Sequence, residues 1–325
     1  MRIFSSHPIL DKLLKGLISL SLLAVAIWIL EWEEVVTALL EFSMISIILS
    51  ILVLLIEFPI LGLRWHLLIR DYCSFNLYRQ LRLYFVANFF NTFTPAQIGG
   101  DTVRFIGLLR DNVGAVTLIG RLLHERMVGL MGFFIFFLGC FLYALALESI
   151  EISSLSSPLL LVAIVISLTL LGALVAAIWG LRIIALIKSF KIIQTKNWMN
   201  KILEMLAAML RFGSAKNVIL VFCLSIIGGS IIWSSAVFII ARDAGVGASF
   251  ALLGMAAILS DLVRFVPFTI QGLGLREATF SYSFYLLGLD AKQGFVIGLV
   301  SYLAVWVAII LIGGIGYLMP ERTKN

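Results

Sequence analysis

The stretch NTFTPAQIGGDTVRFIGLLR, residues 91–110, decides the fold because it interrupts an otherwise apolar chain. Ten consecutive positions within it hold Pro95, Gly99, Gly100, Asp101 and Arg104. Proline removes a backbone donor and glycine allows a tight turn, so an incoming helix has to end here. A second helix then starts, and we expect Asp101 to be its N-cap. The stretch therefore predicts two half-helices that meet at a break.

The composition places this break inside a membrane protein. Of the 325 residues, 62% are hydrophobic and 13% are charged, and the charged fraction is about half that of a soluble domain. The net charge of +6 is typical of loops that collect Lys and Arg on the cytoplasmic side, so we expect no nucleic-acid partner. The three cysteines and three histidines are scattered, which predicts neither a disulfide nor a metal site.

Membrane-spanning helices need about 20 mostly apolar residues, and several segments reach that length. Six are predicted, at residues 14–30, 43–63, 127–147, 159–181, 217–241 and 293–318. The loops alternate in charge, since segments 64–82 and 182–216 are basic whereas segment 31–42 carries only acids. The positive-inside rule then places both termini and the basic loops in the cytoplasm. We expect a multi-pass protein of the cell (inner or plasma) membrane.

A second break, FVPFTIQGLGLR at residues 265–276, repeats the pattern of the first. When Pro267 is aligned with Pro95, a phenylalanine, a glycine and an arginine also coincide, in the form F-x-P-x4-G-x3-R. The alternation of charge makes the two copies enter the membrane from opposite faces. Gly/Pro-interrupted short segments of opposite orientation are typical of inverted-repeat transporters.

These observations predict one all-α integral membrane domain over residues 1–325. It has about six full transmembrane helices and two oppositely oriented re-entrant helix pairs, because the apolar pieces beside the breaks are too short to span. The domain is expected to consist of two diverged halves, at about 1–160 and 161–325. The basic loop 182–216 fits either an interfacial helix attracted to anionic lipid or a consequence of topology alone.

The start of each outgoing half-helix is a natural anion site, because its free N–H groups and positive dipole end point inward. Arg104 and Arg276 lie in the first turn, where the dipole disfavours a cation unless an anion such as a lipid phosphate lies between them. A guanidinium group suits phosphate because its planar fork binds two oxygens. The alternative is that both arginines reach the interface or pair with Asp101 and Glu277.

Other charged residues have two interpretations each. Glu57 lies inside the second span and should face the protein interior, either as a proton-coupling or gating group or as a structural partner of Arg64. Arg121, His124 and Glu125 share a helix face, which suits a proton relay, a phosphate cage or a salt-bridged turn.

The stretches FFNTFTPAQIGGDTVR and GLGLRE resemble the lysylphosphatidylglycerol synthase transmembrane-region family. The resemblance covers nearly the whole chain and implies a lipid-translocase fold with re-entrant helices. Aminoacyl transfer belongs to a separate soluble domain in that family, and we do not expect that activity here. The family pattern matches Asn91, Pro95, Gly99, Gly100, Asp101, Arg104, Arg126, Gly129, Pro267, Gly272, Gly274, Arg276 and Glu277.

We therefore predict a lipid translocase, or flippase, and not an enzyme, with no metal and no cofactor. Its cargo is an anionic phospholipid or a polyprenyl-phosphate-linked intermediate; the alternatives are a membrane-embedded enzyme and a scaffold in lipid or glycan biosynthesis. A homo-oligomer and a biosynthetic enzyme partner both stay open. The predicted substrate-binding residues are Asn91, Pro95, Gly99, Gly100, Asp101, Arg104, Arg126, Asp261, Arg264, Gly272, Gly274, Arg276 and Glu277.

Overall fold

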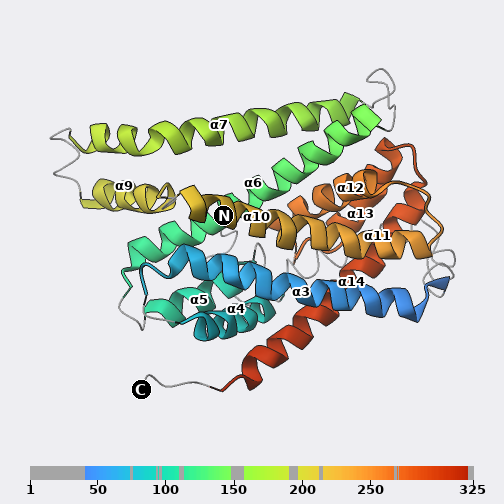
Figure 1. The fold of residues 1–325 in the computed structure, drawn as a ribbon, viewed down its shortest axis with the longest axis horizontal. Coiled ribbons are helices and arrows are strands. Elements are labelled where there is room, and N and C mark those ends of the chain that lie inside the picture. Colours follow the sequence, from blue (N-terminus) through green and yellow to red (C-terminus); the bar gives the residue numbers. More distant parts are fainter. Residues whose placement is uncertain are drawn as a thin grey trace, which may run out of the picture.

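The computed structural model describes residues 41–73, 76–92, 94, 97–109, 113–147, 157–189, 197–211, 215–266, 269 and 271–320. Within these residues the regular structure is helical throughout, with no strand. Long helices run along the bundle and shorter helices lie among them (Figure 1).

Five helices of the described residues are long and apolar enough to cross a membrane. They are α3 (Met44–Ile69), α6 (Ala115–Leu147), α7 (Ser157–Lys188), the continuous run of α10 (Ala215–Leu224), η3 (Ser225–Ile232) and α11 (Trp233–Asp243), and α14 (Ala291–Leu318). These helices coincide with five of the six predicted spans, as candidates by length and composition. The predicted span at 14–30 lies outside the described residues. Helix α6 starts before the predicted residue 127, because its polar first turns find partners on neighbouring helices.

Four short helices form two pairs that correspond to the two predicted breaks. Helix α4 (Leu77–Asn91) packs on α5 (Ile98–Leu109), and α12 (Phe250–Leu262), which continues into η4 (Val263–Phe265), packs on α13 (Leu275–Leu286). At 1.5 Å per residue the α-helices are about 18 to 23 Å long, which is short of a hydrocarbon core of about 30 Å. The two pairs lie toward opposite ends of the bundle (Figure 1). Pro95 and Pro267 lie outside the described residues.

The prediction of Asp101 as an N-cap is wrong, because α5 starts three residues earlier. Other groups satisfy its first amides: the Gly99 N–H donates to Thr94 Oγ1 at 2.8 Å, and the Gly100 N–H donates to Asn91 Oδ1 at 2.6 Å. Because these caps come from the break and from the end of α4, the Asp101 side chain can turn toward basic residues instead.

Helix α10 leads into a π-helical stretch, η3, which the sequence did not predict. Such stretches are frequent at functional sites. Its glycines allow close packing: a Cβ at Gly228 would lie 2.8 Å from Leu61 Cδ2 of α3, and one at Gly229 would lie 3.1 Å from Phe133 Cε1 of α6. The stretch therefore fits between α3 and α6, beside the cavities described below.

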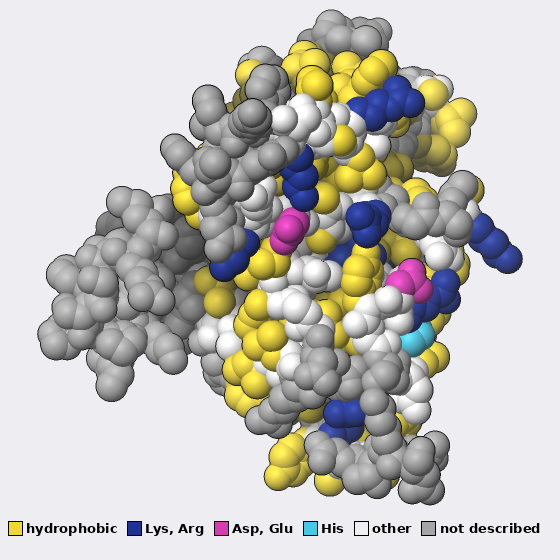
Figure 2. Space-filling view, turned by 90° about the vertical axis from the view of Figure 1, so that its left-hand side faces the viewer, with side chains coloured by type: hydrophobic (Ala, Val, Ile, Leu, Met, Phe, Trp, Pro, Cys, Tyr) yellow, Lys and Arg dark blue, Asp and Glu magenta, His cyan; other side chains and the backbone are white. Residues whose placement is uncertain are grey.

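One end of the bundle, at the left of Figure 1, is basic. Lys and Arg side chains outnumber the Asp and Glu side chains that are visible on this end (Figure 2). The end of α3, the start of α4, the end of α7 and α9 (Asn197–Met209) all reach it (Figure 1). The basic segments thus gather at one end, as the charge alternation suggested; that this end faces the cytoplasm stays a prediction.

Candidate functional site

Two adjoining cavities lie between the helix breaks. One has a volume of about 90 Å³ and is lined mainly from α3, α4, α5 and α6. The other has a volume of about 50 Å³ and is lined mainly from α3, α4, α11, α12, α13 and α14. They adjoin because Glu57, Gln97 and Arg264 line both. We call their charged lining residues the polar centre: Glu57, Arg64, Asp101, Arg104, Glu125, Arg126, Asp261, Arg264 and Arg276.

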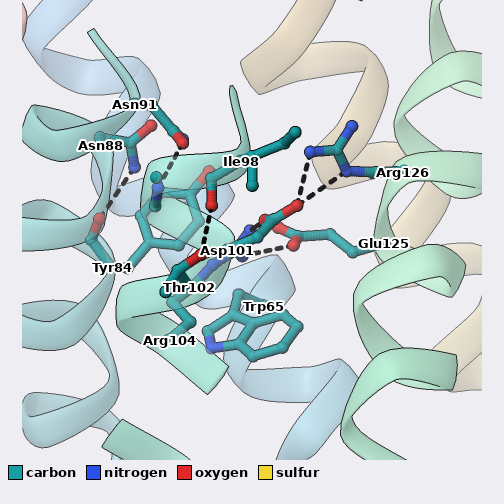
Figure 3. Close-up of polar contacts among 12 residues, drawn as sticks. Trp65, Tyr84, Asn88, Asn91, Ile98, Asp101, Thr102, Arg104, Glu125 and Arg126 are labelled. Carbon is teal, nitrogen blue, oxygen red and sulfur yellow. Dashed lines mark hydrogen bonds and ion pairs between the residues drawn. The ribbon is translucent and has the colours of Figure 1, made fainter. Parts of the chain in front are cut away.

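At the first break, Arg104 of α5 is held by two carboxylates (Figure 3). Its Nη2 donates to Asp101 Oδ1 at 2.5 Å, and its Nη1 donates to Glu125 Oε2 of α6. Arg126 of α6 donates to Asp101 Oδ2 from Nε at 2.9 Å and from Nη2 at 2.5 Å. A chain of alternating charges therefore joins the outgoing half-helix to α6.

The environment of Arg104 extends to two further helices. Its guanidinium carbon lies 4.5 Å from the ring centroid of Trp65 and 5.5 Å from that of Tyr84, which are distances for cation–π attraction. Arg64 of α3 donates from Nη2 to Glu125 Oε1 at 3.2 Å, so Glu125 serves two arginines. The result is a network of three arginines and two acids at the first break, of which Arg126 and Asp101 are partly exposed.

The second break repeats this arrangement with fewer groups. Asp261 of α12 lies 3.1 Å from Arg264 Nη2 and 3.4 Å from Arg276 Nη2. The guanidinium carbon of Arg276 lies 4.3 Å from the ring centroid of Tyr302 and 5.1 Å from that of Trp233. Arg104 and Arg276 thus each pair with an aspartate and face one tryptophan and one tyrosine.

The backbone of both breaks contains a strained glutamine. Gln97 and Gln271 have φ angles of 58° and 56°, and they are the non-glycine residues with positive φ in the described part of the chain. Such conformations persist where the surrounding structure imposes them, and they cluster at functional sites. The Tyr302 hydroxyl donates to the Gln271 carbonyl oxygen at 3.2 Å. The sequence carries a signal for these positions, because each break has a glutamine closely followed by two glycines.

The half-helix amides that were expected to hold an anion have protein partners. Besides the caps on α5, the Gly274 N–H donates to Glu277 Oε2 at 2.7 Å. Gly272 and Gly274 both have φ of 80°, which explains the glycines at these positions. Since Glu277 caps α13, the alternative pairing of Arg276 with Glu277 is not found, whereas that of Arg104 with Asp101 is. An anion at these helix ends has to displace the caps.

Several buried donors of the polar centre lack a partner. The Nε atoms of Arg64, Arg104 and Arg264 are buried without a hydrogen bond, and all three residues line the larger cavity. A buried donor left unsatisfied costs about 1 to 3 kcal/mol. All three donors belong to arginines that line one cavity.

The other predicted residues lie in different parts of the bundle. Glu57 lines both cavities but makes no ion pair with a described residue within 4.0 Å, so the expected partnership with Arg64 is not found. Glu125 belongs to the polar centre. Arg121 instead donates to backbone oxygens of Leu68, Ala208 and Arg211.

His124 Nδ1 contacts the Met209 carbonyl oxygen. His124 and Arg121 thus connect α6 to the end of α9 through the carbonyl oxygens of Met209, Ala208 and Arg211. The three residues that were predicted to share a helix face therefore have different partners. Arg121 and His124 bind backbone carbonyl oxygens, whereas Glu125 pairs with arginines of the polar centre. Sequence reasoning also missed the aromatic partners of the arginines, because a Trp or Tyr in an apolar helix cannot be distinguished from ordinary core.

A helical bundle with five candidate spans, two interrupted helix pairs and a buried arginine–carboxylate centre defines a polytopic membrane protein. Residues 12–313 match the family described as lysylphosphatidylglycerol synthase TM region. The chain belongs to this family. Neither the comparison with curated proteins nor that with solved structures finds a match.

Proposed function

We propose that the protein translocates a membrane lipid with an anionic head group, and that the head group passes through the polar centre. The observation that carries this proposal is one cavity lined by three arginines, each of which keeps a buried Nε donor without a partner. A lipid phosphate supplies several acceptor oxygens and a negative charge, which are what these donors lack. Membership of the family supports a lipid-related role.

The architecture that we infer is the inverted repeat. The pairs α4–α5 and α12–α13 are treated as re-entrant elements that enter from opposite membrane faces, because their helices are too short to span and lie toward opposite ends of the bundle. With the span predicted at 14–30, the chain has six full crossings. Irregular backbone at the breaks is tolerated because it lines a polar cavity.

To bind the arginines, the head group has to replace carboxylates that are already paired with them. Asp261 is shared by Arg264 and Arg276, so one phosphate oxygen can take over one arginine while the aspartate keeps the other. Arg264 lines both cavities and is the residue that passes the anion from one break to the other. The cavities, at about 90 and 50 Å³, hold a few waters and have to widen to admit a head group.

The proposal is tested by reconstitution into liposomes that contain a fluorescent phosphatidylglycerol, phosphatidylcholine or polyprenyl phosphate. Arg264→Gln, and separately Arg104→Gln with Arg276→Gln, should each reduce translocation of the anionic lipids by about tenfold or more, the effect of losing charged hydrogen bonds. Arg242→Gln is the matched control, because Arg242 stacks on Phe238 and lines neither cavity.

Translocation that is unchanged in all arginine variants of the polar centre would refute this path. The lipids are also recovered and analysed, because the proposal contains no covalent step: unchanged lipid is expected, and a converted product would favour a membrane enzyme instead.

A further inference from the structure

An apolar groove lies between α6, α7 and α10, away from the polar centre. It encloses about 390 Å³, and every residue that lines it is apolar. On α6 the groove is lined by Met127 and Met131, whereas Glu125 and Gly129 line the polar cavity. At 100° per residue these two pairs lie on opposite faces of the helix.

Helix α7 covers this groove without packing into it. Leu159, Ala163 and Ile166 near its start are buried, and Ile184 near its end is buried, but no residue from 167 to 183 is. Figure 1 shows α7 diverging from α6 as the two helices run toward the left end, where α9 lies below α7. A spanning helix held at its two ends leaves room for another apolar body along its middle.

The groove is too large and too apolar to stay empty or to fill with water. A dry apolar cavity of about 150 Å³ already takes up benzene, and water needs two or more polar partners, which this lining lacks. Lipid chains are the apolar material that surrounds a spanning helix. The groove runs along the middle of α7, from Leu170 to Ala177, and this elongated shape suits an extended hydrocarbon chain.

The end of the groove near α9 adds a preference for negative charge. Leu210 lines the groove and the next residue, Arg211, is exposed; Lys201 and Lys216 are exposed close by in sequence. Arg121 Nη1 donates to the carbonyl oxygens of Ala208 and Arg211, which holds this corner against α6. Segment 182–216 carries seven bases and one acid, and Figure 2 shows the basic end to which it belongs.

We propose that this groove binds an anionic phospholipid that is not the translocated cargo, with one acyl chain between α6 and α7 and the head group at Arg211. Leu68, Val128 and Val221 form a buried apolar cluster beside the groove, which Val128 also lines. A Cβ at Gly132 would lie 2.9 Å from Ser225 Cβ, so α6 and η3 are in close contact there as well. The bound lipid supports α7 and is independent of the transport path.

The test uses the whole protein in nanodiscs of phosphatidylcholine that contain a little phosphatidylglycerol with a photoactivatable acyl chain. Mass spectrometry of peptides should find the label on the groove residues of α6 and α7. Unlabelled phosphatidylglycerol should compete, and unlabelled phosphatidylcholine should not. Arg211→Gln with Lys216→Gln should remove this preference, since each basic residue near an anionic lipid contributes about fivefold.

Ala177→Trp fills the groove and should reduce labelling strongly, whereas Val175→Trp, on the exposed opposite face of α7, should not. The variants are first checked for unchanged elution by size exclusion. Equal labelling by a photoactivatable phosphatidylcholine overturns the proposal, because the groove is then ordinary bilayer contact. Efficient disulfide formation between two copies of the Ala173→Cys variant also overturns the proposal, because a second copy of the chain would then cover the groove. Translocation is measured separately, so its loss or survival leaves this binding result unaffected.

Discussion

Arg104 and Arg276 occupy matching environments at the two helix breaks. Each guanidinium pairs with an aspartate and stacks against one tryptophan and one tyrosine. The tryptophans, Trp65 and Trp233, both come from the spanning run that precedes the broken pair, α3 in one case and α11 in the other. The tyrosines come from helices that do not correspond, Tyr84 from α4 and Tyr302 from α14. The two environments therefore match in residue type but only partly in the position of the residues in the fold.

The shared carboxylate Asp261 should be the most stabilising acid of the second break. Asp261→Asn leaves two arginines without their acid and should lower the free energy of unfolding by about 3 kcal/mol, measured by chemical unfolding in detergent. The exposed pair of Asp71 with Arg70 is the control, because Asp71→Asn should change stability by less than about 1 kcal/mol. Adding Arg276→Gln to Asp261→Asn should recover part of the loss; a further additive loss would contradict the pairing.

Tyr302 has two separable contributions. Tyr302→Phe keeps the ring beside Arg276 and removes the hydrogen bond to Gln271, which should cost about 1 kcal/mol. Tyr302→Leu should cost about 1 kcal/mol more, since it also removes the cation–π contact. Thermal unfolding of the two variants measures the difference. Equal melting temperatures for Phe and Leu would show that the ring does not stabilise Arg276.

Gly100 should tolerate no side chain. A Cβ there would lie 2.4 Å from the Ala87 carbonyl oxygen, so Gly100→Ala has to push α5 away from α4 and should destabilise by about 1 to 3 kcal/mol. Gly139 of α6 has no atom within 4 Å of the corresponding position. Gly139→Ala should therefore be neutral or slightly stabilising, as is usual in a helix interior. Similar melting temperatures for the two variants would argue against the close α4–α5 packing.

Glu57 is the acid of the polar centre that can take up a proton without breaking an ion pair to a described residue. If it couples transport to protons, Glu57→Gln should keep lipid binding and remove the response of translocation to a pH gradient across the liposome. Glu204→Gln is the control, because Glu204 is exposed on α9. A gradient response that persists in Glu57→Gln excludes this role.

The orientation of the bundle is open to a labelling experiment. The positive-inside rule predicts that Ser189→Cys, after α7, reacts only when the cytoplasmic side is exposed, and that Gly247→Cys, after α11, reacts from the outside. Nothing lies within 4 Å of a Cβ at Gly247, so that substitution should not disturb the fold. Labelling of both positions from one side would disprove the inverted arrangement of the two broken pairs.

The spans and breaks were predictable because they depend on local properties. Apolar length located five helices, and prolines and glycines located both interruptions. Local spacing also allowed the pair of Arg104 with Asp101, three residues apart on one helix, as one of two alternatives.

The long-range partners were not predictable in this way. Glu125 reaches Arg104 across 21 residues because α6 crosses beside the first break, and no spacing rule contains that crossing. The π-helical turn of η3 also has no sequence signal of its own, since GG in an apolar helix is equally compatible with regular α-helix.

The polar centre contains five guanidinium groups and four carboxylates. With all of them ionised, these lining groups carry a net charge of +1, and the buried carboxylate of Glu277, next to Arg276, brings the sum to zero. In the function that we propose, an anionic head group then adds one negative charge in a medium that solvates charge poorly. A proton taken up by a carboxylate of the centre would cancel that charge. The charge balance would thus couple the binding of an anionic lipid to protonation.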